Sequence, residues 1–165
     1  LRKNNEYEIN YAGTDIQKAE EINATTYIPR GSTALNDAIG RTIIDMKCRL
    51  KDMETNVVVV ITTDGMENAS VEFRRGQIRK MIQECEEKLG WKFIYLAADD
   101  ASFDEYERIG VGRGRSFKTG RGQRGYDNAL KVMSSKLSLF RVSGSEEDLD
   151  FSDLERKTSD DLGDE

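Results

Sequence analysis

The chain has no histidine, a single proline and two cysteines in 165 residues. Without histidine, a histidine-ligated zinc site, a serine-histidine triad and a histidine acid-base pair are all excluded. The longest apolar run, residues 57–61, is far too short to span a bilayer, and no secretory signal opens the sequence. We therefore expect no membrane partner and predict a cytoplasmic location. Cys48 and Cys85 lie on apolar helical stripes and are predicted to be free core thiols, with a disulfide as the alternative.

Charge is distributed unevenly along the chain. Residues 144–165 carry ten acids and two bases, a net charge of −8, so that with an overall charge of −6 residues 1–143 have a net charge of about +2. This segment has few large apolar side chains to offset the entropy lost on ordering. The pattern predicts a domain over residues 1–141 and a disordered acidic tail over 142–165. A partner-docking segment, or a helical stretch from Leu149 to Leu154, is the alternative.

Apolar residues recur at helical spacing in several segments, with apolar runs of strand length between them. Helices are predicted over residues 33–53, along the stripe from Ile78 to Leu89, over 103–109, and from Tyr126 to Phe140. Strands are predicted at 56–62, 91–98 and 116–119, and the alternating residues 6–13 indicate a half-exposed edge strand. Helices that alternate with buried strands are typical of an α/β fold with a mostly parallel sheet.

Acidic residues follow two of the predicted strands directly. Asp64 ends the run VVVVITTDG, and Asp99 and Asp100 end the run WKFIYLAADD. Ligands of open α/β sheets bind outside the carboxyl ends of the strands. The sequence therefore places Asp64, with Asp99 and Asp100 nearby, on the ligand-binding edge.

Two stretches, RGSTALNDAIG (30–40) and ITTDGMENAS (61–70), together resemble the second and third metal-site loops of the von Willebrand factor A (vWA) domain family, in its intracellular bacterial and phage-type members. The first stretch supplies Thr33 at the start of a helix, and the second supplies Asp64 after a buried strand. The resemblance extends through GWKFIYLAADD and ALKVMSSKLSLFR and covers about residues 1–141. It implies a Rossmann-like three-layer fold.

The resemblance also implies a metal ion-dependent adhesion site, in which Mg²⁺ leaves one position open for an acidic side chain of a partner protein. Thr33 would offer a hydroxyl and Asp64 a carboxylate, which are oxygen ligands of the kind that Mg²⁺ prefers. Two structural alternatives remain: Thr33 or Ser32 as a helix N-cap, and Asp64-Gly65 as a plain turn. Glu67 and Asn68 are expected to fix the loop and not to bind metal.

The first metal loop of the family, Asp-x-Ser-x-Ser, does not occur in this sequence. Residues 100–104 come closest, but they lie in the wrong place and are better interpreted as a helix cap. We therefore expect this chain alone to hold Mg²⁺ weakly or not at all. Relative to the family the domain is expected to be incomplete at its N-terminus, which favours self-association or completion by another chain.

Residues 108–125 contain six basic residues, six glycines and no acid. No Walker lysine follows the glycines. A mobile loop is one interpretation, docking of the acidic tail is a second, and nucleic-acid contact is a third, with phosphates bound by Arg113, Arg115, Arg121 and Arg124.

The sequence is thus interpreted as a protein-interaction module of the vWA type and not as an enzyme. An arginine- and glycine-rich nucleic-acid-binding protein is the first alternative. A metal-dependent hydrolase built on Asp64 and Asp99 is the second, and the absence of histidine weighs against it.

Overall fold

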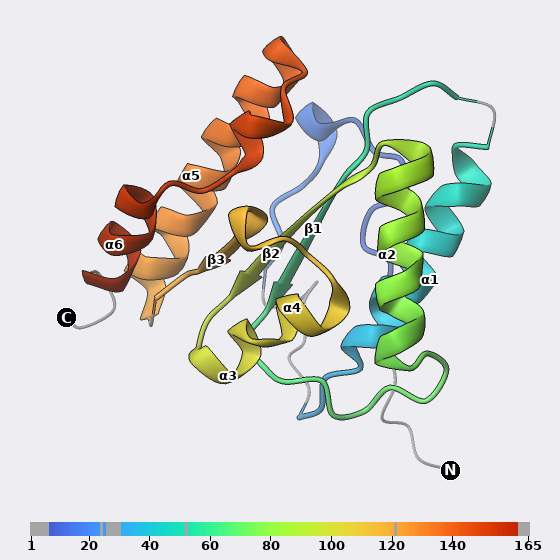
Figure 1. Cartoon of the computed structure of the whole chain (residues 1–165), viewed down its shortest axis with the longest axis horizontal. Coiled ribbons are helices and arrows are strands. Elements are labelled where there is room, and N and C mark those ends of the chain that lie inside the picture. Colours follow the sequence, from blue (N-terminus) through green and yellow to red (C-terminus); the bar gives the residue numbers. More distant parts are fainter. Residues whose placement is uncertain (1–6, 24, 26–30, 52, 121, 162–165) are drawn as a thin grey trace.

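A computed structural model describes residues 7–23, 25, 31–51, 53–120 and 122–161. Its centre is a parallel sheet of three strands, β1 (Val58–Thr63), β2 (Lys92–Ala97) and β3 (Ser116–Lys118), in the order β1-β2-β3 (Figure 1). Ile61 of β1 lies opposite Tyr95 of β2, and Tyr95 lies opposite Ser116 of β3. The predicted α/β fold with a parallel sheet is confirmed.

Helices cover both faces of the sheet, because successive strand residues point to opposite sides and both sides are apolar. On one face lie α1 (Leu35–Arg49), α2 (Arg75–Leu89), α3 (Asp100–Phe103) and α4 (Glu105–Ile109). Phe93 and Tyr95 of β2 point into this layer and pack against Ile43 of α1 and Ile78 and Ile82 of α2. All five side chains are fully buried.

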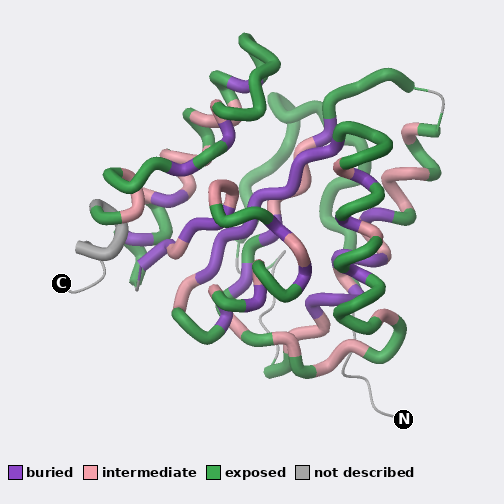
Figure 2. Tube along the Cα trace, viewed as in Figure 1, coloured by how far each residue is buried: buried purple, intermediate pink, exposed green. Residues whose placement is uncertain are grey.

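The second face is covered by α5 (Gly122–Ser143), by the 3₁₀ turn η3 (Glu146–Leu149) and by α6 (Asp153–Asp161). Ile94 and Leu96, the alternate residues of β2, pack here with Phe117 of β3 and Phe140 of α5. Figure 2 shows β2 as a continuously buried strand, and all six of its residues are buried. The protein is therefore a three-layer α/β structure with one core on each side of the sheet.

The acidic C-terminal segment is ordered through α6, which corrects the prediction of disorder over this part of residues 142–165. Leu149 is fully buried, and the ring of Phe151 stacks on that of Phe117 with centroids 4.6 Å apart. The Arg156 guanidinium donates hydrogen bonds to the carbonyl oxygens of Arg113, Gly114 and Ser116. The three anchors Leu149, Phe151 and Arg156 give the segment enough buried contacts to fold onto the glycine-rich loop. A count of charges along the sequence does not reveal them.

The predicted edge strand over residues 6–13 is wrong for residues 7–13, which form no strand. Residue 6 lies outside the described residues. The only helical element of the N-terminal segment within residues 7–23 is the 3₁₀ turn η1 (Ile16–Lys18). An alternating pattern makes a strand only beside a partner strand, and β1 pairs with β2 alone among the strands described.

Both cysteines are free, as predicted, but only Cys85 is a core thiol. Cys48 is exposed on α1, because the apolar stripe of that helix is narrower than its sequence indicates. None of the helices in the described residues is long and apolar enough to cross a membrane.

Candidate functional site

Asp64 follows the last residue of β1 and lies at the carboxyl edge of the sheet. Thr63 shapes the turn: its hydroxyl donates to the Gly65 carbonyl at 2.8 Å and accepts from the Gly65 amide at 3.2 Å. Asp64 lines a cavity of about 260 Å³ with residues from all three strand ends and from the first turn of α5. Within the described part of the chain its carboxylate has no hydrogen bond or ion pair. It is available to a ligand.

Thr33 is brought to the same edge by Asn68. The Thr33 amide donates to Asn68 Oδ1 at 2.9 Å, and the Asn68 amide donates to the Thr33 carbonyl at 3.0 Å. The Thr33 hydroxyl lies over Gly65, where an added Cβ would come within 2.9 Å of Thr33 Oγ1. We call the two linked loops, residues 31–34 and 64–70, the Thr33–Asp64 ledge. The two residues singled out in the sequence therefore share one surface.

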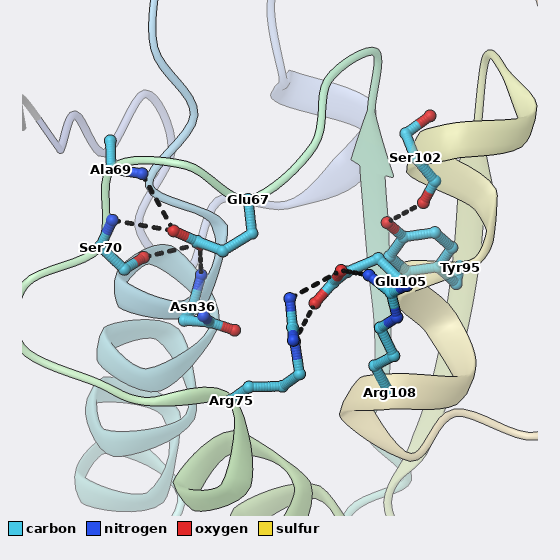
Figure 3. A network of polar contacts seen from close by, with 9 residues as sticks. All are labelled: Asn36, Glu67, Ala69, Ser70, Arg75, Tyr95, Ser102, Glu105 and Arg108. Atoms are coloured by element: carbon cyan, nitrogen blue, oxygen red, sulfur yellow. Dashed lines mark hydrogen bonds and ion pairs between the residues drawn. The ribbon is translucent and has the colours of Figure 1, made fainter.

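The start of α1 is capped by the ledge and not by its own preceding side chain. The N-cap residue is Ala34, which excludes Thr33 or Ser32 as the cap. Instead, Glu67 Oε2 accepts the Asn36 amide at 2.7 Å (Figure 3). The Ser70 hydroxyl accepts the Asp37 amide at 3.0 Å. A carboxylate at this position also suits the positive end of the helix dipole.

Glu67 uses its second oxygen within the loop, where Oε1 accepts the amides of Ala69 at 3.0 Å and Ser70 at 2.8 Å. With Oε2 also bound by the Ser70 hydroxyl at 2.7 Å, the carboxylate makes four hydrogen bonds in all. The prediction that Glu67 and Asn68 fix the loop is confirmed.

Asp37 is the second loop anchor, and its side chain is only 2% exposed. Its carboxylate accepts the amides of Val71, Glu72 and Phe73 at 2.9, 3.0 and 2.9 Å. Burial alone would raise the pKa of Asp37, but these three hydrogen bonds favour the charged form and hold the pKa below its usual value. Sequence reasoning missed Asp37, although a carboxylate in the first turn of an apolar helix is a signal for such a role.

The acids after β2 are engaged elsewhere. Asp99 caps α3, where its Oδ1 accepts the Ser102 amide at 2.7 Å and the Ser102 hydroxyl at 2.6 Å. Asp100 accepts a hydrogen bond from Lys118 Nζ at 3.0 Å. Ser32, the other predicted residue of the edge, also has an interaction partner. The structure thus brings Thr33 and Asp64 together and leaves Asp99 and Asp100 to structural contacts.

A separate buried network fixes α4 beside α2. Arg75 donates to Glu105 through Nε at 2.6 Å and Nη2 at 3.2 Å, and Arg108 Nη1 lies 3.5 Å from the same carboxylate (Figure 3). The Tyr95 hydroxyl donates to the Ser102 carbonyl at 2.8 Å, and burial, with the Glu105 and Asp99 charges, raises its pKa. Each group is satisfied within the network, so its role is structural.

The donor set of the ledge fits Mg²⁺ in kind but not in number. Thr33 and Asp64 supply one hydroxyl and one carboxylate, whereas Mg²⁺ takes six oxygen ligands in octahedral geometry. Asn36 Oδ1 is buried without a hydrogen-bond donor, but it does not line the Asp64 cavity. In the described residues no three acidic or cysteine side chains gather as a metal site.

The described arginines of the glycine-rich segment have interaction partners within the chain. The Arg113 guanidinium lies 5.1 Å from the Phe103 ring centroid, and Arg115 Nη2 lies 3.0 Å from Glu86 Oε1. Arg124 also has an interaction partner, and Arg121 lies outside the described residues. Together with the hydrogen bonds from Arg156, this geometry matches docking of the C-terminal segment.

Comparison with family models, with curated proteins and with solved structures gives no match for this chain.

Proposed function

We propose that the chain is a protein-interaction module of the vWA type, which docks a partner on the Thr33–Asp64 ledge. The observation that supports this function is the reciprocal link between Thr33 and Asn68, which holds the Thr33 hydroxyl over Gly65, the residue that follows Asp64. Anchoring by Glu67 and Asp37 orders the ledge before any ligand arrives, so little conformational entropy is lost on docking. No catalytic step is part of this proposal.

Thr33 and Asp64 are the two residues of this chain that would hold Mg²⁺. A bound Mg²⁺ would supply an electrophilic centre for an acidic side chain of the partner. Since two protein ligands are too few, the remaining ligands have to come from water or from another polypeptide. Thr33 and Asp64 orient the acidic group, and the ordered loop around Glu67 keeps both in place.

The proposal is tested by following backbone amide chemical shifts during titration with Mg²⁺. We expect shifts confined to residues 31–34 and 64–70, lost in Asp64→Asn and in Thr33→Val. Asp104→Asn is the matched control, because Asp104 is an exposed carboxylate outside the ledge. Shifts that persist unchanged in Asp64→Asn, or that appear only elsewhere, would refute a role for the ledge in metal binding.

The open edge of β1 is a second contact surface that we include in this proposal. Among the residues that the structure describes, β1 is hydrogen-bonded to β2 alone, and Val58, Val59 and Val60 are half-buried although every β2 residue is buried. An unpaired apolar edge strand is a template for another strand. We propose that a strand of another polypeptide, or of a second copy, pairs there.

Size-exclusion chromatography tests this pairing. We expect the purified chain to self-associate and Thr62→Lys to reduce self-association, because Thr62 is the exposed position of β1 and a charge on the edge opposes strand addition. A well-folded monomer that remains a monomer at high concentration would contradict the pairing. That result would not bear on metal binding at the Thr33–Asp64 ledge, which the chemical-shift titration tests separately.

A further inference from the structure

A groove of about 520 Å³ lies at the end of the molecule opposite the Thr33–Asp64 ledge. It is formed by the C-terminal turns of α1 and α2 and by the loop that leads into β1. Trp91, which directly precedes β2, is part of its lining. Its volume falls in the range of ligand-binding pockets in proteins.

Four of the ten residues that line the groove are apolar. Trp91 is 4% exposed and Leu50 is half-buried, and both belong to the core beneath α1 and α2. Leu89 and Met53 remain 47% and 63% exposed. Large apolar side chains exposed around a concave surface favour burial of an apolar group of a ligand.

Three lysines, Lys47, Lys51 and Lys88, also line the groove. Lys47 and Lys88 lie in the last turns of their helices, where a cation offsets the negative end of the helix dipole. This explanation does not cover Lys51, which lies beyond the end of α1. Neither Lys51 nor Lys88 forms a hydrogen bond or an ion pair, with Glu54 and Glu84 of the lining or with any other described residue.

We propose that this groove binds an acidic peptide segment of a partner protein, in which one large apolar side chain is flanked by carboxylates. The apolar side chain lies against Leu50, Leu89 and Trp91. The flanking carboxylates pair with Lys51 and Lys88, neither of which forms an ion pair with another described residue. This site is separate from the ledge and does not depend on the function proposed for it.

The sole tryptophan of the chain reports directly on the groove. We would titrate the protein with the peptide acetyl-Asp-Asp-Leu-Asp-Asp-amide and follow Trp91 emission, with anisotropy of a dye-labelled peptide as an independent measurement. We expect saturable binding that weakens with added salt, because the pairs are exposed to solvent. Replacing leucine in the peptide by glycine should weaken binding at least tenfold.

The double variant Lys51→Glu/Lys88→Glu should also weaken binding at least tenfold. Both lysines are exposed, so the fold should be unaffected. Lys80→Glu is the matched control, because Lys80 is an exposed lysine of α2 outside the groove, and its affinity should equal that of the wild type. Absence of saturable binding in both measurements would overturn the proposal. So would equal binding of the glycine peptide, of the double variant, or of decanoate in place of the peptide.

Discussion

Asn68 and Thr33 hydrogen-bond to each other in both directions, at 2.9 Å through the Asn68 side chain and at 3.0 Å through its backbone. The pair joins the loop before α1 to the loop after β1. Neither contact uses the Thr33 hydroxyl, which lies over Gly65, the residue after Asp64. The geometry of the ledge therefore depends on Asn68, while the chemistry that we propose for it depends on Thr33 and Asp64.

Replacement of Asn68 by alanine should loosen the ledge. The variant loses the acceptor of the Thr33 amide, and a lost hydrogen bond of this kind costs about 1 kcal/mol of unfolding free energy. We expect hydrogen exchange at the Thr33 amide to accelerate, which is measured by mass spectrometry or NMR. Asn10→Ala, at an exposed position outside the ledge, is the control. Unchanged exchange at Thr33 would contradict the role given to Asn68.

A side chain at Gly65 should displace the Thr33 hydroxyl. An alanine Cβ would lie 2.9 Å from Thr33 Oγ1, which forces Thr33 to rotate or shift. We expect Gly65→Ala to abolish the Mg²⁺-dependent chemical shifts with less than about 1 kcal/mol loss of stability, because only the half-buried side chain of Thr33 has to shift. Gly31→Ala, which meets no atom within 4 Å, should leave the shifts intact. Wild-type shifts in Gly65→Ala would show that the Thr33 hydroxyl is not a ligand.

Asp37 should matter for stability and not for binding. Asp37→Asn places an amide where three backbone amides require an acceptor, and we expect a loss of about 2–3 kcal/mol in urea unfolding. Asp45→Asn is the control, since Asp45 forms only an exposed pair with Arg49. A loss no larger than that of the control would contradict the anchoring role.

The contribution of Asp37 should also depend on pH. Because its pKa is lower in the folded chain than in the unfolded chain, its stabilisation is complete above the unfolded value of about 3.9. It is lost as pH falls through the folded-state pKa. The difference in unfolding free energy between wild type and Asp37→Asn should therefore shrink below about pH 4. A difference that stays constant down to pH 2 would contradict the lowered pKa.

Arg156 should hold the C-terminal segment on the glycine-rich loop. Arg156→Ala removes hydrogen bonds to three carbonyls, and a hydrogen bond that involves a charged group has a net contribution of about 1.5–3 kcal/mol. We expect faster hydrogen exchange over residues 146–157 and a stability loss of about 2 kcal/mol. Lys157→Ala, at the next and exposed position, should have neither effect.

The regular elements of the fold could be predicted because local signals agree with their surroundings. The stripe from Ile78 to Leu89 with Gly90 after it gives α2, which ends at Gly90 with φ of 66°. The apolar run before Asp64 gives β1. Strand pairing cannot be read from one segment, and so the alternating residues 6–13 were misjudged: their pattern needs a neighbouring strand.

The site could be predicted in part. Thr33 stands out because it directly precedes a predicted helix, and Asp64 because it directly follows a predicted strand. The structure brings both residues to one edge of the sheet. The anchors Asp37 and Ser70 act across more than thirty residues of sequence, so spacing alone does not reveal them. The C-terminal segment was missed for the same reason, since its buried contacts are made by Leu149, Phe151 and a single arginine.

Binding of acetate, as a stand-in for the acidic side chain of a partner, tests the central claim most directly. Its dissociation constant should be measured by NMR with and without Mg²⁺, for the wild type and for Asp64→Asn. The account predicts that Mg²⁺ tightens acetate binding at least tenfold in the wild type, with shifts at residues 31–34 and 64–70, and has no effect in Asp64→Asn. Acetate binding that ignores Mg²⁺, or that responds equally in Asp64→Asn, would contradict it.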